Sequence, residues 1–199
     1  MERVVPGIFM PMTVTTPTLY LARHATPDWS RTDLPYHVPP GPPLVPQGEA
    51  EAAEMGRFLR EAGVVRLLAS PLERARHTAE IAAGVAERPF VVEAALAEWQ
   101  PTEKPEDIRA RFWPVREQTV AHSLQAGPLA WVTHGGPIGF FLDELGLPKD
   151  TLAYYKRTFD RSNPVPPGGV WKLTRPASGE PWDVSLAFVP EAYRRKLMV

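Results

Sequence analysis

Short apolar segments alternate with helical patterns along most of this chain, and this alternation is the feature that most limits its fold. Residues 18–22, 64–69, 90–92 and 129–133 have the composition of β-strands. Helical patterns follow these segments, at 71–86, 105–125 and 135–145, with one more at 46–62. This order of elements is typical of an α/β protein with a largely parallel sheet.

The end of the chain departs from that alternation. Residues 170–173 and 184–188 read as two more strands with no helical pattern between them, so at least one antiparallel pairing is expected. A short helix is predicted near 150–159. The length of 199 residues corresponds to about one domain, and a single domain over 1–199 is predicted.

Proline marks the irregular regions. The chain has 24 prolines, and seven of them lie in residues 25–46, which therefore cannot form a regular helix or a central strand. Loops of this length in compact domains are usually functional or disordered, and this one is predicted to lie near the functional site. Residues 1–17, rich in Pro and Thr, are predicted to form an extended lead-in.

Composition excludes several classes of function. The formal net charge of −1 gives no reason to expect binding to nucleic acid or to an anionic membrane. Because the chain has no Cys, it cannot use disulfides, thiolate metal sites or a Cys nucleophile. No apolar run approaches the roughly 18 residues of a membrane span, and prolines interrupt the first residues where a signal peptide would be apolar. A soluble, cytoplasmic protein is expected, and its oligomeric state stays open.

Residues capable of phosphate chemistry follow three of the predicted strands. The first strand ends in Arg23-His24, the second is followed by Ser70 and Arg74, and the fourth by His134-Gly135-Gly136. Carboxyl ends of parallel strands meet at one edge of a sheet, so these groups are expected to face one space. Arginine forks and helix N-termini both suit phosphate oxygens. The pattern predicts a cationic pocket for a phosphoryl group.

One local signal within this pattern concerns the start of the second helix. Ser70, Pro71 and Glu73 have the spacing of an N-cap, a first-turn proline and a capping box. The sequence therefore predicts that the Ser70 side chain caps this helix.

The same motifs, in this order, resemble the histidine phosphatases of the phosphoglycerate mutase-like superfamily. Leu19-Tyr20-Leu21-Ala22-Arg23-His24-Ala25 resembles the family's strand that ends in Arg-His-Gly. Residues 44–52 resemble its Leu-Thr-x-x-Gly helix start, residues 69–80 its Ser-x-x-x-Arg-Ala-x-x-Thr-Ala element, and residues 131–136 its second histidine motif. Each match is weak alone, but together they follow the family's order from about residue 18 to 188.

The resemblance implies a fold, a reaction and a set of roles. The fold is a three-layer αβα sandwich around a mostly parallel, mixed sheet. The reaction is hydrolysis of a small phosphate monoester through a phosphohistidine, without metal or other cofactor. His24 is the implied nucleophile. Arg23, Arg74 and His134 are implied to hold the phosphoryl oxygens, and Glu98, in a Leu-x-Glu context, is the implied acid and base. Glu93 and Glu103 are the rival carboxylates.

Departures from the family pattern bear on the exact reaction. Ser30 stands where mutase-type members carry a phosphate-binding Asn, so Ser30 is a candidate phosphate ligand. Val45 replaces the usual Thr cap, so the helix that follows is expected to lack a side-chain cap. Residues 99–104 do not resemble the mutase pattern, which favours a phosphatase over phosphoglycerate mutase-type transfer.

Proteins of other classes are also considered. A non-catalytic phospho-ligand-binding protein could keep the same pocket without turnover. An α/β-hydrolase esterase would need Gly-x-Ser-x-Gly, and a P-loop enzyme would need Gly-x-x-x-x-Gly-Lys-Ser/Thr. The chain contains neither motif.

Overall fold

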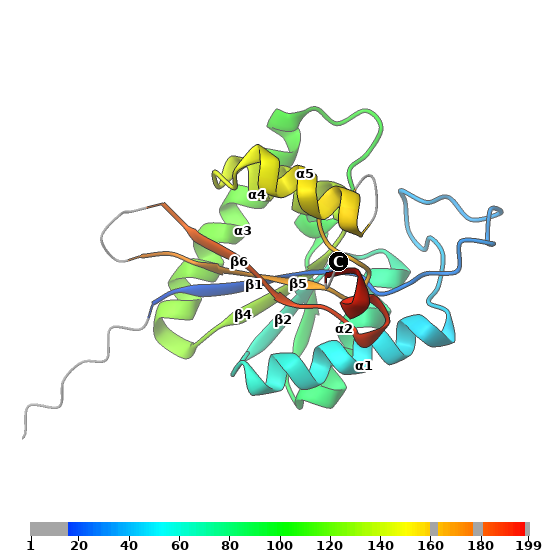
Figure 1. The fold of residues 1–199 in the computed structure, drawn as a ribbon, viewed down its shortest axis with the longest axis horizontal. Helices are drawn as coiled ribbons and strands as arrows, with labels where there is room; N and C mark the ends of the chain where they lie inside the picture. The colour runs from blue at the N-terminus through cyan, green and yellow to red at the C-terminus, as the bar shows by residue number, and fades with distance from the viewer. Residues whose placement is uncertain (1–15, 160–162, 177–180, 198–199) are drawn as a thin grey trace, which may run out of the picture.

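A six-stranded sheet forms the centre of the molecule. The computed structural model describes residues 16–159, 163–176 and 181–197, so almost all of the predicted lead-in at 1–17 lies outside the described residues. The strands stand in the order β3-β2-β4-β1-β5-β6 (Figure 1). Their bounds are β1 Thr18–Arg23, β2 Arg66–Ala69, β3 Phe90–Val92, β4 Leu129–Thr133, β5 Val170–Thr174 and β6 Asp183–Phe188.

The sheet is mixed but mostly parallel, as predicted. Strands β1 to β4 pair in parallel, with Leu21 of β1 opposite Trp131 of β4. Strand β5 runs antiparallel to both of its neighbours, β1 and β6. The predicted antiparallel closing pair is therefore present, and β5 also joins that pair to the parallel part of the sheet.

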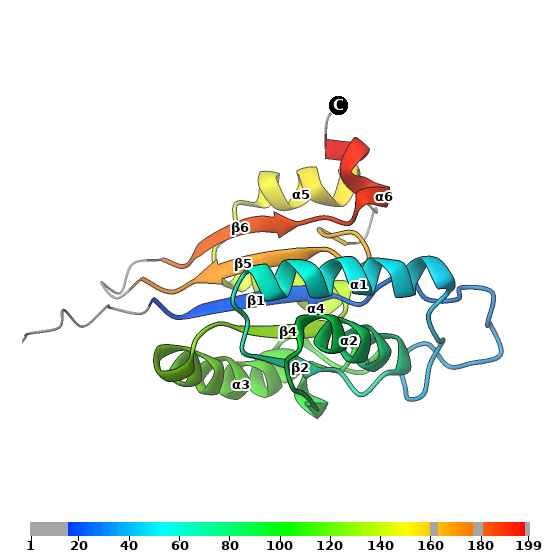
Figure 2. The same ribbon diagram turned by 90° about the horizontal axis from the view of Figure 1, so that it is seen from below.

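Helices cover both faces of the sheet (Figures 1 and 2). Helices α1 (Pro46–Glu61) and α2 (Glu73–Ala86) lie on one face. On the other lie α3 (Pro105–Ala126), α4 (Gly135–Glu144) and α5 (Lys149–Thr158). The shorter elements are η1 (Ala94–Leu96), α6 (Glu191–Arg194) and η2 (Arg195–Leu197). These layers confirm the predicted three-layer sandwich.

Alternating residues of β1 divide the core between the two faces, because successive side chains of a strand point in opposite directions. Leu19 and Leu21 pack in the cluster that contains Phe112 of α3 and Phe141 of α4. Tyr20 and Ala22 pack in the cluster formed with α1 and α2. A strand buried on both faces in this way is typical of the centre of an α/β sheet.

Helices α1 and α2 pack closely because small residues line their crossing. A Cβ added to Gly56 of α1 would lie 2.7 Å from the Ala82 carbonyl oxygen of α2, closer than real contacts allow. Ala79 and Ala82 are both fully buried at this interface. A larger side chain at position 56 would force the two helices apart.

The start of α2 corrects one prediction. The capping box proposed for Ser70 and Glu73 is wrong: α2 begins at Glu73, and its N-cap residue Leu72 makes no side-chain cap. The Glu73 carboxylate instead pairs with Arg76 at 2.8 Å. The Ser70 hydroxyl accepts a hydrogen bond from the Leu72 N–H but also lies 2.7 Å from Nε2 of His134. A buried imidazole nitrogen needs a partner, and Ser70 supplies it.

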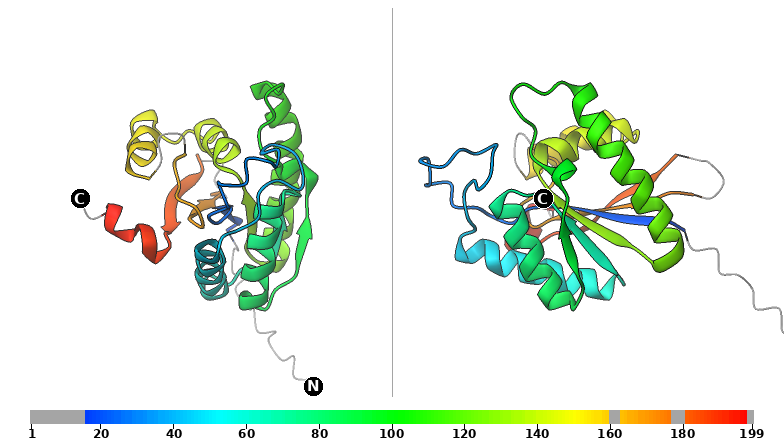
Figure 3. Two further views of the ribbon diagram at one scale, coloured as in Figure 1. Left: turned by 90° about the vertical axis from the view of Figure 1, so that its right-hand side faces the viewer. Right: turned by 180° about the vertical axis from the view of Figure 1, so that it is seen from behind.

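Helix α1 begins as the sequence predicts. Its N-cap residue, Val45, makes no side-chain hydrogen bond to the helix, and Pro46 occupies the first helical position. The carboxyl ends of β1, β2 and β4 meet at one edge of the sheet, and the segment 25–46 passes across this edge (Figure 3, left).

Candidate active site

His24 follows the last residue of β1 and is fully buried. Its Nδ1 lies 2.8 Å from the carbonyl oxygen of Ala25. A carbonyl oxygen can only accept, so Nδ1 carries the proton and donates it, which leaves a lone pair on Nε2. Nε of Arg74 donates to this lone pair over 3.2 Å. Nε2 of His24 is therefore unprotonated and accepts a hydrogen bond from Arg74.

The surroundings also keep His24 uncharged. Burial lowers the pKa of its imidazole well below the ordinary value, and the positive charges of Arg74 and Arg23 lower it further. Both effects disfavour the imidazolium ion. At neutral pH the lone pair of His24 is thus available.

His134 follows β4 and occupies the N-cap position of α4. The centroid of its ring lies 5.2 Å from that of His24, and its side chain is fully buried. Burial lowers the pKa of His134 well below the ordinary value, followed by the effects of His24 and Arg74. Its Nε2 contacts Ser70, whereas its Nδ1 has no hydrogen-bond partner within the described part of the chain.

Two arginines frame the histidines. Arg74, in the first turn of α2, is fully buried and donates from Nη1 to the carbonyl oxygen of Tyr36 at 2.9 Å. Among the described residues, its Nη2 has no hydrogen-bond partner. Arg23, the last residue of β1, is 3% exposed and donates from Nη1 to the Val165 carbonyl oxygen. Two guanidinium groups are thus fixed at this edge of the sheet.

Glu98 lies shortly after η1 and completes the cluster. Its Oε2 lies 3.6 Å from Nη2 of Arg74 and 3.7 Å from Nδ1 of His134. Both distances are too long for direct hydrogen bonds. Burial raises the pKa of the Glu98 carboxyl above its ordinary value, against the opposing effects of the Trp99 N–H and of Arg74. A raised pKa suits a carboxyl group that must be able to carry a proton.

The rival carboxylates and Ser30 lie elsewhere. Glu93 caps η1 by accepting from the Ala95 N–H, and Glu103 forms an ion pair with Arg111 at 2.8 Å. Ser30 is exposed and its hydroxyl donates to Asp28 at 2.6 Å. The structure therefore brings together His24, His134, Arg23, Arg74 and Glu98, and does not bring Ser30 to them.

The segment 25–46 lies over this cluster through Tyr36. The Tyr36 ring packs on the Arg74 guanidinium, with 4.0 Å between the guanidinium carbon and the ring centroid. The Trp29 ring stacks on the Tyr36 ring, with 5.4 Å between the two centroids. Nδ1 of His37 lies 3.0 Å from the Trp99 carbonyl oxygen, which joins the segment to the residues that follow Glu98.

Sequence reasoning missed two residues that hold the site in place. The hydroxyl of Thr78 accepts from the Ala25 N–H at 3.0 Å and donates to the Arg74 carbonyl oxygen at 2.6 Å. Its spacing of four residues from Arg74 places both on one helix face, a signal that was available. The Asn163 side chain fills the space that a Cβ on Gly135 would occupy. No local pattern announces that contact.

A buried carboxylate supports the backbone just beyond His24. Glu51 of α1 is 2% exposed and accepts from the N–H of Thr26 at 2.8 Å and from its hydroxyl at 2.9 Å. The Tyr193 hydroxyl of α6 donates to the same carboxylate at 3.1 Å. Three distant parts of the chain therefore meet two residues after the candidate nucleophile.

The described residues contain neither a cluster suited to a metal ion nor a helix suited to crossing a membrane. In residues 16–159, 163–176 and 181–197, no group of three or more His, Asp or Glu side chains is arranged to hold a metal ion. Across the same residues, no helix combines the length and the apolar character that crossing a bilayer requires.

Comparison with known families agrees with this geometry. Residues 19–102 match the model of the histidine phosphatase superfamily (branch 1). This matched range includes Arg23, His24, Arg74 and Glu98. The resemblance predicted from the sequence is confirmed over residues 19–102, which make up somewhat less than half of the chain. No curated protein matches the chain.

Solved structures give the same fold. A phosphoglycerate mutase from Bacillus anthracis is 16% identical, with a TM-score of 0.69 over 87% of this chain and 93% of the other. A mycobacterial glucosyl-3-phosphoglycerate phosphatase in complex with VO3 is 18% identical, with a TM-score of 0.66 over 87% of this chain and 98% of the other. A protein described as mycobacterial hydrolase 2 is 17% identical, with a TM-score of 0.66 over 92% and 97% of the two chains. At these identities the likeness establishes the fold.

Proposed function

We propose that this protein hydrolyses a small phosphate monoester through a phosphohistidine at His24, with Glu98 as the acid and then the base. The observation that supports this proposal most is the convergence of unsatisfied groups beside the nucleophile. Nη2 of Arg74 and Nδ1 of His134 lie buried without a hydrogen-bond partner among the described residues. Such atoms are costly unless a ligand completes them, and phosphoryl oxygens would do so.

The first half-reaction uses the lone pair of His24. Nε2 attacks phosphorus, the bond between phosphorus and the ester oxygen breaks, and the departing oxygen takes a proton from Glu98. The Arg74 N–H that now faces Nε2 turns to a phosphoryl oxygen as the lone pair is used. The positive charges of Arg23 and Arg74 offset the charge on the phosphoryl group. The products are the alcohol, the phosphohistidine and a Glu98 carboxylate.

The second half-reaction returns the site to its starting state. Glu98, now ionised, takes a proton from a water molecule as the water oxygen attacks phosphorus. The bond between phosphorus and Nε2 breaks, and inorganic phosphate leaves. His24 is again neutral and Glu98 again holds a proton, so one carboxyl group serves both steps. No step requires a metal ion, since arginines supply the positive charge.

A trapping experiment tests the proposal. The protein is mixed with a ³²P-labelled alkyl phosphate and quenched in alkali, in which phosphohistidine survives, and the label is located after digestion. We expect label on His24 in the wild type and none in His24→Asn. His122→Asn, on the far helix α3, is the control and should label normally. Label on another residue, or turnover in the absence of any labelled protein, would contradict the assignment.

Two further assays separate this function from its alternatives. Conversion of 3-phosphoglycerate to 2-phosphoglycerate faster than release of phosphate would favour a mutase. Binding of phosphate esters with no turnover would favour a non-catalytic binding protein. Chelation should leave the rate unchanged, and a rate lost on chelation and restored by magnesium would exclude a metal-independent mechanism.

A further inference from the structure

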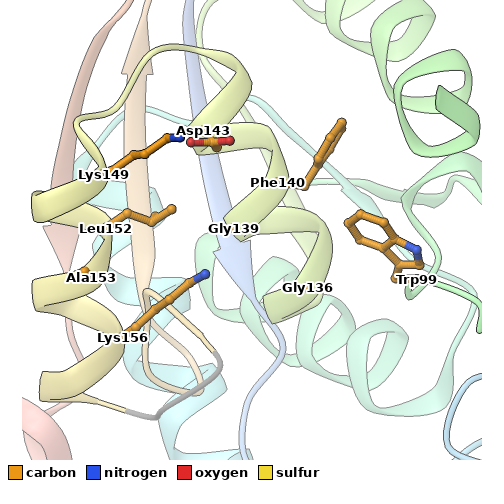
Figure 4. Close-up of a pocket in the computed structure, with 9 residues that line it drawn as sticks. All are labelled: Trp99, Gly136, Gly139, Phe140, Asp143, Lys149, Leu152, Ala153 and Lys156. Carbon is orange, nitrogen blue, oxygen red and sulfur yellow. The ribbon is translucent and has the colours of Figure 1, made fainter. Parts of the chain in front are cut away.

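A groove of about 470 Å³ opens beside the catalytic cluster on the outer side of α4 (Figure 4). Helix α4 forms its floor, α5 forms one wall and Trp99 stands at the other side. Its lining residues are Trp99, Gly136, Gly139, Phe140, Asp143, Lys149, Leu152, Ala153 and Lys156. The proposed catalytic steps use none of these side chains.

The groove reaches the catalytic carboxyl group at Gly136. A Cβ on Gly136 would lie 3.2 Å from Oε1 of Glu98 and 3.8 Å from Cβ of Trp99. A side chain at this position would crowd Glu98, so the glycine lets the carboxyl group lie directly against the wall of the groove. Because Glu98 is proposed to protonate the leaving oxygen, the leaving part of the substrate must extend from Glu98. The groove is one space that can receive it.

The side chain of Lys156 reaches from α5 to α4 and contacts it near Gly139, about one helical turn after Gly136. A Cβ on Gly139 would lie 4.0 Å from Nζ of Lys156, so the ammonium group rests against bare helix backbone. Figure 4 shows Lys156 and Lys149 both extending from α5 toward α4. Gly136 and Gly139 are about 4.5 Å apart along the helix axis, since the rise is about 1.5 Å per residue. Lys156 is therefore close to the end of the groove that adjoins Glu98.

The charge of the groove is net positive. Lys149 and Lys156 face one carboxylate, Asp143, among the lining residues. Glu144, the next acidic residue of α4, is neutralised by Arg109, with 2.8 Å between Oε2 and Nε. Within the described residues, neither lysine forms an ion pair, so the ammonium groups are available to an anion.

The other lining residues suit the body of a small molecule. The rings of Trp99 and Phe140 meet edge to face with 5.5 Å between their centroids, and Leu152 adds apolar surface from α5. Pockets for small ligands commonly combine such apolar walls with a few charged groups that fix orientation.

We propose that the leaving part of the substrate lies in this groove and carries a second anionic group, a carboxylate or a second phosphate, which Lys156 binds and Lys149 supports. This inference rests on the proposed function, because it requires Glu98 to face the leaving oxygen. The substrate class it names is a phosphate monoester of a hydroxy acid, or a bisphosphate, with a few bonds between the two anions.

Matched ester pairs test the proposal. 6-Phosphogluconate and glucitol 6-phosphate differ only in a carboxylate against a hydroxymethyl group, and 3-phosphoglycerate and glycerol 3-phosphate form a shorter pair. The quantity measured is the ratio of kcat/KM for the acid to that for its neutral partner. In at least one pair the wild type should show a ratio of about fivefold or more, the range of a charge-assisted hydrogen bond at a partly exposed site.

Lysine variants locate the source of that ratio. Lys156→Met should bring the ratio close to one, Lys156→Glu should invert it, and Lys149→Met should reduce it less. Lys172→Met is the matched control, because Lys172 is paired with Tyr20, whose side chain points to the α1 and α2 face of the sheet. The control should keep the wild-type ratio.

The outcomes separate this inference from the function on which it rests. If the wild type hydrolyses none of the four esters nor p-nitrophenyl phosphate, the proposed function itself fails. If it hydrolyses them with ratios near one, or if Lys156→Met and Lys172→Met change the ratio equally, hydrolysis stands and the groove assignment is overturned.

Discussion

The catalytic cluster and the segment that covers it are built in opposite ways. His24, Arg74 and His134 are fully buried, and each belongs to, or directly follows, a strand or helix of the sandwich. Half of the residues in the segment 25–46 are exposed, and Trp29 keeps 54% of its surface accessible. The cluster is thus held by the core, and the cover is held by a few side-chain contacts.

This contrast assigns different tasks to the two regions. Preorganised groups in a water-excluded site stabilise the transition state because they need not reorganise during the reaction. An exposed loop tolerates change and adapts to ligands. We therefore expect substitutions in the cluster to act on the chemical steps, and substitutions in the segment 25–46 to act on substrate binding.

The largest effect is expected at the nucleophile. His24→Ala removes the proposed nucleophile and should lower kcat by at least about 10³-fold, as loss of a nucleophile does in other enzymes. Steady-state kinetics with an alkyl phosphate measures it, and circular dichroism checks that the fold is retained. His122→Ala is the control on α3. A folded His24→Ala protein within tenfold of the wild-type rate would break the comparison at its strongest point.

The next effect depends on the leaving group. Glu98→Gln cannot donate a proton, and general acid catalysis is typically worth about 10²–10⁴-fold when the departing oxygen is strongly basic. The pre-steady-state burst should fall by that range for an alkyl phosphate and far less for p-nitrophenyl phosphate, whose phenolate departs without help. Dephosphorylation should slow for both esters. Equal loss of the two bursts would mean that Glu98 is not the acid, and Glu93→Gln and Glu103→Gln would then be compared in the same way.

A pH series should move the two half-reactions in opposite directions. The pKa of Glu98 is raised by burial, so the protonated acid persists above the ordinary carboxyl range and is lost as pH rises through the raised value. The alkyl-phosphate burst should therefore fall with rising pH, by up to about tenfold per unit beyond that pKa. Dephosphorylation, which needs the carboxylate, should fall as pH drops through the same value.

His24 should add no limb of its own to this profile near pH 6.5. Its pKa lies well below the ordinary value because of burial and the neighbouring arginines, so its lone pair stays free across that range. The control is Glu98→Gln, which should lose both limbs and keep only the ionisation of the substrate. An acidic limb centred near pH 6.5 that survives in Glu98→Gln would place a titrating histidine in the mechanism.

A smaller effect is expected in the covering segment. Tyr36→Ala removes the ring from the Arg74 guanidinium, a contact typically worth about 0.5–2 kcal/mol. We expect KM to rise by roughly two- to tenfold, with kcat within about twofold. The reason is that the ring orients Arg74, which is proposed to bind the phosphoryl group, and takes no part in the chemistry. Tyr36→Phe keeps the ring and should match the wild type. A fall in kcat comparable to that of Glu98→Gln would show that the cover is part of the chemical machinery.

The smallest effect is expected at Ser30. Its hydroxyl donates to Asp28, and the residue is exposed, so Ser30→Ala should leave kcat and KM within about twofold of the wild type. The same kinetic assay measures it, with Ser70→Ala as the contrasting serine, because Ser70 holds Nε2 of His134. A Ser30→Ala protein with a KM raised more than tenfold would restore Ser30 as a phosphate ligand and show that the cover moves on binding.

The fold was largely accessible from the sequence because its signals are local. Strand β4, followed directly by the histidine and by α4, could be placed from composition and glycine positions alone. The parallel order also follows from the alternation of strands and helices. Local signals could not predict which of two possible hydrogen-bond partners a side chain contacts in the folded chain. Ser70 has the spacing of a cap, yet its hydroxyl also serves a histidine 64 residues away.

The candidate site divides in the same way. The positions of His24, Arg74 and His134 follow from strand ends, which any parallel sheet brings to one edge. The contact of Tyr36 with Arg74 depends on the path of a proline-rich segment, and the side chain of Asn163 reaches Gly135 from another loop. Such contacts are set by tertiary packing and carry no periodic pattern that could announce them.

The carboxylate of Glu51 has a practical consequence for anyone who prepares this enzyme. It accepts hydrogen bonds from the Tyr193 hydroxyl of α6 and from Thr26, two residues beyond His24. The backbone next to His24 is thereby connected to α6. Trimming the chain before Tyr193, or fusing a bulky affinity tag that pulls α6 from its seat, would leave a buried carboxylate short of a donor. Purification handles should therefore be attached at the N-terminus, because β1 begins at Thr18, at the end of the strand opposite to His24.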